Sequence, residues 1–416
     1  MGRSETLRVL HFSFPYPQYV RQFYESRPGL SRRTFDEQDT ELKADHFGGA
    51  SPGWPFWLTK LGYETRDHSA SIKGLQETWA REHRIEFGPD RWMLDIARAQ
   101  VLDFNPHVLA INPQSVPKAW LRELRNDAAS LKIVLSRYSS PDTDVDRFAL
   151  SDLVLSGDRR QVDQLRARGI RAVLQHHGFD TRVLDRLPAS ATCEHDVLFT
   201  GQLHRQEGFH LYRAEVLKAL SDAGVPLELR LLASESDRTE RIKLVARRAA
   251  WKMSAATRRL GVSERTIARM PGLSRALSSP RPPRPLDRQL RRSIATPIFG
   301  LEMYRTLAAS RVALNVHADV SVEDANNLRL WEATGVGTCL LTDAKQNLDE
   351  LFEVGKEIVA FDSSEDCVEK ARWLLSDPAA RAEIAAAGQR RTLRDHTYEQ
   401  RVIGLDEAIR EAMDNA

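Results

Sequence analysis

The stretch NNLRLWEATGVGTCLLTD, residues 326–343, decides the fold prediction because it joins an amphipathic pattern to a glycine stop and a buried strand. Asn326, Arg329 and Glu332 recur at steps of three, so their polar groups would share one broad face of a helix. The Gly-x-Gly that follows can end this helix, and residues 338–341 are typical of a short buried strand. A helix followed by a buried strand is the repeating unit of parallel α/β folds.

The three polar residues of this predicted helix also suggest a ligand. A guanidinium can meet a diphosphate, and a carboxylate can accept hydrogen bonds from ribose hydroxyls, so an amide, a cation and an anion aimed one way suit a nucleotide-sugar. The alternative is a surface pair of Arg329 and Glu332 at i, i+3 spacing, with no ligand.

Short runs rich in Val, Ile and Leu alternate with helical patterns in both halves of the chain, which indicates parallel α/β units. In the first half the predicted strands are 7–12, 107–111, 131–135, 152–155 and 172–175. In the second half they are 196–200, 227–232, 312–316, 338–341 and 357–361. We therefore expect two doubly wound, Rossmann-like domains that face each other across a cleft.

The domain limits follow from the connecting segments. The small-residue stretch LPASATCE at 187–194 is the predicted linker, so the first domain would span 1–190 and the second 191–397. Residues 398–416 form a predicted amphipathic helix that packs on the body and crosses back to the first domain. The polar and aromatic stretch 15–45 is longer than a normal loop after a strand, and we interpret it as a lid.

Composition limits the class of protein. The chain has 416 residues, 42% of them hydrophobic, which suits a globular protein of two domains. Cys193, Cys339 and Cys367 show no metal-ligand or disulfide spacing, and neither a signal peptide nor an apolar run of about 18 residues is evident. We expect a cytoplasmic protein without a structural metal.

Charge is concentrated in one segment. Residues 238–292 hold 16 Lys and Arg residues but only three acidic ones. Apolar residues recur at helical spacing among these cations: Ile242, Val245, Ala249 and Met253. The segment is a basic insertion in the second domain, and it is either an exposed Arg-rich excursion or a contact with an anionic membrane at the inner face that presents a lipid-linked acceptor. Nucleic acid is not expected as a partner, because Trp251 is the only aromatic residue there.

With these motifs in place, most of the chain resembles the GT-B glycosyltransferases, and among them the CgeB-like (spore-maturation-protein-like) branch of the group 1 enzymes. FGGASPGWPFWLTKLGYE at 47–64 is similar to the glycine loop and helix near the start of these enzymes, where Gly48 and Gly49 would let backbone approach the ligand. TPIFGLEMYRTLAASRVALNVH at 296–317 and HTYEQR at 396–401 also look like this branch.

The second predicted domain opens with another family pattern. DVLFTGQLHRQEGFHLYRAEVLKAL at 196–220 resembles the strand, glycine turn and helix of the nucleotide-binding domain, with Gly201 at the turn. Related enzymes hold the diphosphate with cations in or after this turn. The resemblance therefore implies roles near phosphate for Arg205 and Arg213.

The stretch 326–343 resembles the second half of the E-x7-E pattern of retaining GT-B enzymes, with Glu332 in the ribose-binding position. Eight residues earlier stands Asp324, with Glu323 beside it, in place of the usual Glu. The resemblance implies a site without metal, retention of sugar configuration, and a place for Asp324 beside the donor sugar. The Asp-rich run 142–146 follows a proline and is interpreted as a loop or helix cap.

The resemblance implies a hexosyltransferase-like enzyme, without cofactor, that moves a sugar from a nucleotide-sugar to a hydroxyl acceptor in surface polysaccharide or glycoconjugate assembly. The expected donor-binding residues are Gly48, Gly49, Gly201, Arg205, Arg213, Asn326, Arg329 and Glu332. His177 follows a predicted strand and could relay the acceptor proton, with Asp324 as the other catalytic candidate. The alternatives are a loop role for His177, a GT-B-fold nucleotide-sugar epimerase, or a non-catalytic surface or spore-coat component.

Overall fold

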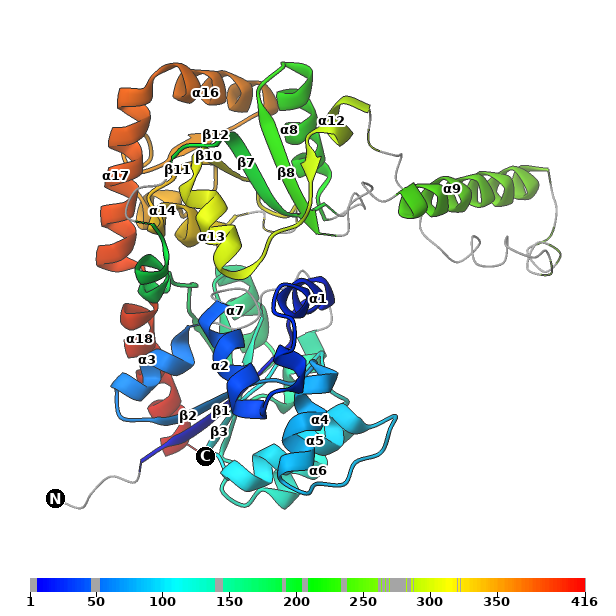
Figure 1. The fold of residues 1–416 in the computed structure, drawn as a ribbon, viewed down its shortest axis with the longest axis vertical. Coiled ribbons are helices and arrows are strands. Elements are labelled where there is room, and N and C mark those ends of the chain that lie inside the picture. The colour runs from blue at the N-terminus through cyan, green and yellow to red at the C-terminus, as the bar shows by residue number, and fades with distance from the viewer. Residues whose placement is uncertain are drawn as a thin grey trace.

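In the computed structural model, the chain forms two α/β domains, one above the other in Figure 1. The structure describes residues 6–415 except for 46–52, 139–144, 189–191, 204–208, 233–237, 320, 322 and most of 261–287. Each domain contains a six-stranded sheet, and all neighbouring strands in both sheets run parallel. The prediction of two doubly wound domains is confirmed.

The first sheet has the strand order β2-β1-β3-β4-β5-β6. Its strands are β1 (Arg8–Ser13), β2 (Glu64–Ser69), β3 (Val108–Ala110), β4 (Ile133–Arg137), β5 (Leu153–Ser156) and β6 (Ala172–Leu174). The helices of this domain are α3 (Trp54–Lys60), α4 (Lys73–Glu82), α5 (Trp92–Phe104), α6 (Lys118–Asp127) and α7 (Arg159–Arg166). The strand order changes direction between β1 and β3, which makes their carboxyl ends a topological switch point where ligands of such sheets bind.

The second sheet has the order β12-β11-β10-β7-β8-β9. Its strands are β7 (His195–Gln202), β8 (Leu227–Leu232), β9 (Ile294–Ala295), β10 (Ser310–Asn315), β11 (Cys339–Asp343) and β12 (Val359–Phe361). Its helices are α8 (Leu211–Asp222), α12 (Arg288–Arg292), α13 (Gly300–Ala308), α14 (Arg329–Gly335), α15 (Leu348–Leu351), α16 (Ser364–Ser376) and α17 (Pro378–Asp395). This is the dinucleotide-binding strand order, and its switch point lies between β7 and β10.

The stretch 15–45, which we interpreted above as a lid, is helical and packed on the first domain. It forms α1 (Pro17–Glu25), a 3-10 turn (Leu30–Arg32) and α2 (Phe35–Asp45), and its apolar side chains are buried against α4. The periodicity was hidden by the many charged residues on the outer faces of these short helices. This part of the chain is therefore a packed wall of the first domain.

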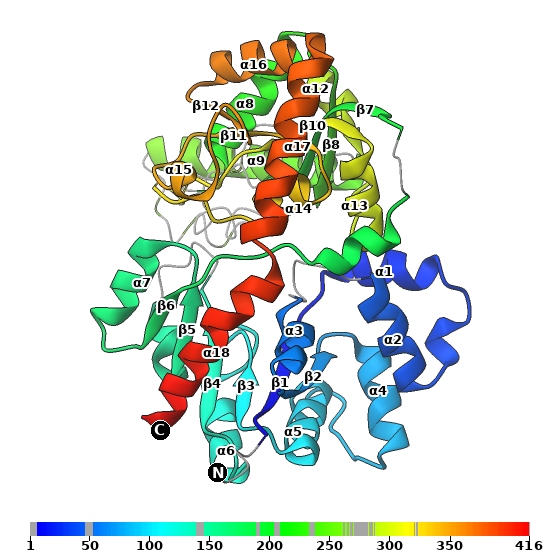
Figure 2. The same ribbon diagram turned by 90° about the vertical axis from the view of Figure 1, so that its left-hand side faces the viewer.

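The final helix, α18 (Tyr398–Asp414), returns to the first domain and lies along its sheet (Figure 2). Val402, Leu405 and Ile409 share a hydrophobic core with residues of β1, β4 and β5. This confirms the expected crossing back of the C-terminal helix. The limits 1–190, 191–397 and 398–416 stay a prediction, and Phe179 and Val183 already pack into the core of the second domain.

Two helical glycines offer a matched test of packing. A Cβ at Gly388 in α17 would lie 2.3 Å from the carbonyl oxygen of Glu357, whereas a Cβ at Gly404 in α18 would meet only the Gln175 side chain at 3.7 Å. We expect Gly388→Ala to lower the free energy of unfolding by about 1–3 kcal/mol through overpacking. Gly404→Ala should leave it unchanged or raise it by up to about 1 kcal/mol, because alanine favours helix. Urea unfolding of both variants measures this, and equal effects would contradict the packing.

Candidate functional site

Two adjoining cavities lie at the carboxyl ends of the two sheets. The C-domain cavity, about 320 Å³, is bounded mainly by β7, the segment before α13, and α14. The interdomain cavity, about 510 Å³, is bounded by the ends of β1, β3 and β4 on one side and by the segments after β10 and before α14 on the other. Tyr16, Arg213, Asn327 and Leu328 line both. Both topological switch points therefore open into one continuous site.

Arg329 and Glu332 on α14 line the C-domain cavity together. Arg329 Nη1 lies 2.7 Å from Glu332 Oε2, and the two side chains are only 13% and 5% exposed. Burial raises the pKa of Glu332, while Arg329 and a hydrogen bond from Tyr304 act to lower it. The pair is thus a buried ion pair at a cavity wall rather than the surface pair considered above. Within the described residues, Arg329 Nε has no hydrogen-bond partner.

Asn326 does not share the helix face predicted for it. The helix begins at Arg329, with Leu328 as its N-cap, so Asn326 lies before it. The Asn326 side chain packs against Gly157 of the first domain. A Cβ added at Gly157 would lie only 1.7 Å from Asn326 Oδ1, so no larger residue fits there without a shift. Its neighbour Asn327 donates a hydrogen bond to Asn315 at the end of β10, which ties the segment before α14 to the second sheet. Asn326 lines the interdomain cavity, and Asn327, which the sequence reasoning missed, lines both.

Gly201 and Arg213 sit at the switch point of the second sheet. Gly201, near the end of β7, lines the C-domain cavity, so the main chain is exposed to a ligand there. Arg213 donates to the carbonyl of Val316 at 2.9 and 2.6 Å and to that of Gln202 at 2.6 Å. Burial lowers the pKa of Arg213 to about 10. Its main contacts brace the ends of β7 and β10, which shapes the cavity they border.

Asp324 lies at the junction of the two domains. Its carboxylate accepts a hydrogen bond from the backbone N–H of Arg159, at 2.8 Å, and faces the Arg159 guanidinium at 3.4 Å. Arg159 opens α7 of the first domain and also pairs with Glu350. Asp324 is buried and lines neither the C-domain nor the interdomain cavity. In this arrangement it connects the domains.

His177 lines the interdomain cavity from the first domain, as expected of a residue that follows β6. Burial and then the nearby Arg137 hold the pKa of its imidazole well below the usual range. The ring is therefore neutral at physiological pH and a weak base. Its backbone carbonyl accepts from Arg401 Nε at 3.3 Å, which ties this turn to α18.

His11 and Asp67 form a pair that sequence reasoning did not find. His11 on β1 is the register partner of Asp67 on β2, and His11 Nδ1 lies 2.8 Å from Asp67 Oδ1. The His11 ring packs edge-on against Trp54 at 5.1 Å, and both residues line the interdomain cavity. No hydrogen bond to His11 Nε2 occurs in the described part of the chain. A carboxylate behind one ring nitrogen orients the other for proton transfer.

A second histidine–aspartate pair was also missed, on the opposite side of the interdomain cavity. His317, just after β10, has its Nδ1 2.7 Å from Oδ1 of Asp343 at the end of β11. Burial acts to raise the pKa of Asp343, but His317 and Lys345 outweigh it and hold the pKa at about 2. His317 lines the cavity, and among the described residues its buried Nε2 has no partner. The pair therefore leaves a buried polar atom without a partner at the wall of this cavity.

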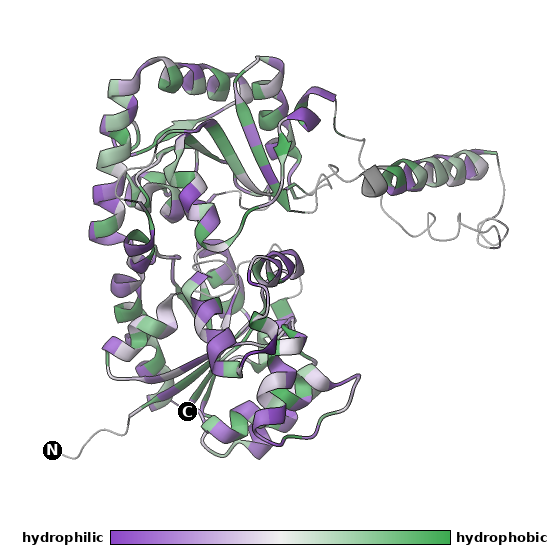
Figure 3. Cartoon of the chain, viewed as in Figure 1, coloured by the Kyte–Doolittle hydropathy of each residue, from purple (hydrophilic) through white to green (hydrophobic). Residues whose placement is uncertain are grey.

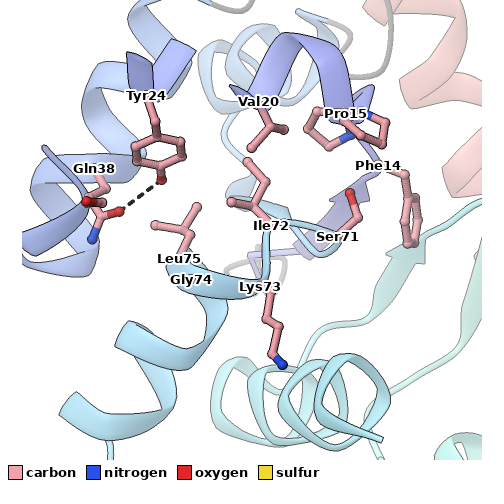
Figure 4. Close-up of a pocket in the computed structure, with 12 residues that line it drawn as sticks. Phe14, Pro15, Val20, Tyr24, Gln38, Ser71, Ile72, Lys73, Gly74 and Leu75 are labelled. Carbon is pink, nitrogen blue, oxygen red and sulfur yellow. Dashed lines mark hydrogen bonds between the residues drawn. The ribbon is translucent and has the colours of Figure 1, made fainter. Parts of the chain in front are cut away.

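A third cavity, about 510 Å³, lies within the first domain between α1, α2 and α4 (Figure 4). Its walls are mainly apolar, with Val20, Ile72 and Leu75 among them, and Tyr24 donates a hydrogen bond to Gln38 at 2.9 Å across one side. Phe14 lines both this cavity and the interdomain one. An apolar hollow thus adjoins the polar site.

Some predicted positions cannot be placed. Gly48, Gly49 and Arg205 lie outside the described residues, as does most of the Asp-rich run 142–146. Asp146 is described and pairs with Arg168 at 3.8 Å. Over the described ranges, no group of three or more His, Cys, Asp or Glu residues is arranged to hold a metal ion.

The two parallel α/β domains with their switch points facing one site define the GT-B fold. An α-glucosyltransferase solved with UDP-glucose and DNA containing an abasic site superimposes with a TM-score of 0.55 at 12% identity, over 97% of this chain and 99% of that one. HepE from Anabaena, in complex with UDP-glucose, gives 0.53 at 11% identity over 97% and 100%. AviGT4, a glycosyltransferase of avilamycin A biosynthesis, gives 0.50 at 15% over 99% of each chain.

In sequence, residues 264–406 match the family described as glycosyl transferase-like. This segment contains α13, α14, β10 and β11, the elements that carry Arg329, Glu332 and His317. No curated protein matches the sequence. The structural likenesses are too low in identity to show more than the fold, whereas the family match covers the part of the site that α13, α14 and the end of β10 supply.

Proposed function

We propose that the protein is a glycosyltransferase that moves a sugar, of the hexose class, from a nucleotide-sugar to a hydroxyl acceptor. The observation that carries this proposal is the buried Arg329–Glu332 pair in a cavity at the switch point of a dinucleotide-type sheet. The family match of residues 264–406 and the GT-B fold support the same reaction. We assign the protein to the CgeB-like branch, in surface polysaccharide or glycoconjugate assembly in the cytoplasm.

The C-domain cavity has the shape and chemistry for the nucleoside. Its apolar walls, from Phe199, Phe299 and Met303, suit a flat base, and the main chain at Gly201 supplies backbone polar groups. Glu332 would accept hydrogen bonds from the ribose, and Arg329 would face the diphosphate. His317, whose Nδ1 is hydrogen-bonded to Asp343, would lie beside the diphosphate on the interdomain side.

The interdomain cavity then holds the transferred sugar and the acceptor hydroxyl. Asn326, Asn327 and Ser321 from the second domain face His11 and His177 from the first across this space. His11 is the stronger candidate for the base, because Asp67 orients its ring and stabilises the imidazolium that forms, whereas His177 is buried beside cations. The apolar cavity beyond Phe14 offers a place for a nonpolar part of the acceptor.

The stereochemical course of sugar transfer depends on which residue acts on the acceptor or on the donor sugar. The expectation of retention came from the partial E-x7-E pattern, but Asp324, at its first position, is bonded to Arg159 and lines neither cavity. A base at His11 suits direct displacement by the acceptor oxygen, with departure of the nucleoside diphosphate and inversion at the anomeric carbon. The anomeric coupling constant in the proton NMR spectrum of the product distinguishes the two courses.

Nucleotide binding is the first test of this function. We expect at least one nucleoside diphosphate or its sugar to raise the melting temperature, since ligand at 100 times its Kd adds about 2.7 kcal/mol to stability. Met303→Trp fills the C-domain cavity and should abolish the shift, whereas Met253→Trp, at a side chain 58% exposed on the surface, should retain it. If no nucleotide at millimolar concentration stabilises the wild type, the proposed function fails. Isomerisation of the sugar without acceptor would instead indicate an epimerase.

A further inference from the structure

The basic insertion contains a helix that lies away from the body. Helix α9 (Arg238–Arg259) extends sideways from the second domain, well clear of both sheets (Figure 1). One face is buried: Leu244 is 7% exposed and Ser254 is fully buried, and Arg248 donates to the carbonyl of Pro282 at 2.6 Å. The helix is therefore covered on one side, where Arg248 contacts Pro282, and open to solvent on the other.

The open side of α9 is apolar. Ile242, Val245, Met253 and Leu260 are 58%, 50%, 58% and 81% exposed, and Ala246, Ala249 and Ala256 between them are exposed as well. At about 100° per residue, these seven positions fall within an arc of roughly 100°. Figure 3 shows hydrophobic and hydrophilic residues side by side along this helix. Soluble proteins rarely leave such an ordered apolar stripe uncovered, so the stripe indicates an interaction site.

Cations border the stripe on both sides. By the same helical geometry, Lys252 and Arg259 lie along one edge of the stripe, and Lys243 lies about 60° beyond the other edge. Residues 241–260 contain seven Lys and Arg residues and no Asp or Glu. This charge excludes a basic or strongly cationic partner and complements an anionic one.

We propose that α9 is an interfacial anchor that lies in the surface of an anionic phospholipid membrane, with the apolar stripe inserted and the flanking cations among the headgroups. An apolar arc flanked by basic residues, on a helix without acidic ones, is the pattern of helices that bind the membrane interface. Each Lys or Arg near an anionic surface adds attraction that salt weakens. None of the described helices is both long and apolar enough to cross a bilayer, so α9 would bind at the surface. This inference does not depend on the transferase activity.

Vesicle co-sedimentation of the full chain tests the anchor. We expect recovery with vesicles of phosphatidylcholine containing about a third phosphatidylglycerol, at least tenfold weaker binding to phosphatidylcholine alone, and loss in 0.5 M salt. Ile242→Asn with Met253→Asn should weaken binding at least tenfold, and Lys252→Gln with Arg259→Gln should do likewise. Ile403→Asn, which changes a side chain 54% exposed on α18, is the matched control and should bind as the wild type does.

Three results would overturn the anchor. Equal recovery with neutral and anionic vesicles would show that electrostatic attraction does not contribute to binding. Unchanged binding of the Ile242/Met253 variant would show that the apolar stripe does not insert. Binding of a single-stranded oligonucleotide without vesicle binding would show that the cations serve nucleic acid instead. Circular dichroism and thermal unfolding of each variant confirm that the fold is intact, so a loss of vesicle binding can be attributed to the surface.

Discussion

Replacing His11 by alanine is expected to lower kcat by about 10²- to 10⁴-fold while nucleotide affinity stays near the wild-type value. A positioned general base contributes a rate factor of this size, and His11 borders the interdomain cavity rather than the C-domain cavity. Asp67→Asn should reduce kcat less, because Asp67 positions the ring through Nδ1 at 2.8 Å and does not touch the substrate. Steady-state kinetics at several pH values, with isothermal titration of the nucleoside diphosphate, separate the two effects.

His177→Ala is the informative comparison for this prediction. Its imidazole lines the same cavity but is held neutral by burial and by Arg137, so we expect a smaller loss than in His11→Ala. A large loss for His177→Ala together with nearly normal turnover of His11→Ala would reverse the assignment of the base. In that case the His11–Asp67 pair would be a contact between β1 and β2 only.

The elements predicted best from the sequence are those whose buried residues follow a simple hydrophobic pattern. Residues 227–232 match β8 fully, because LELRLL has a leucine at every second position and these leucines are buried. β2, which reads ETRDHS, escaped detection since it is an edge strand whose outer residues are partly exposed. β9 is a two-residue strand and leaves no periodic signal.

The residues of the candidate site also differ in how readily the sequence reveals them. Arg329 and Glu332 were predictable because both lie within one turn of one helix, where spacing alone sets the geometry. His11–Asp67 and His317–Asp343 join neighbouring parallel strands that are 56 and 26 residues apart, so only strand order and register bring them together. Asn326 was misplaced because its contact with Gly157 lies in the other domain, which helical spacing cannot reveal.

The Arg329–Glu332 pair gives the second large expected effect, since the ion pair has both a structural and a ligand-binding aspect. Arg329→Leu or Glu332→Gln alone should lower the free energy of unfolding by about 3–5 kcal/mol, because each leaves a buried charge without its partner. The double variant should recover most of this loss, as uncharged replacements of a buried pair are often neutral. The amide oxygen that Glu332→Gln introduces would still accept the hydrogen bond from Tyr304.

Nucleotide binding should not recover with stability in the double variant. Hydrogen bonds to charged groups contribute about 1.5–3 kcal/mol each, and neutral ones about 0.5–1.5 kcal/mol. Loss of the phosphate donor, with a neutral amide in place of the ribose-accepting carboxylate, should therefore weaken nucleoside diphosphate binding at least about tenfold. Urea unfolding and isothermal titration of the four proteins complete the cycle. A stable double variant that binds nucleotide as tightly as the wild type would reduce the pair to a brace between α14 and α13 and move the donor assignment to other residues of the C-domain cavity. A stable double variant without affinity would show that the carboxylate and the guanidinium are kept buried at the cavity wall for the donor.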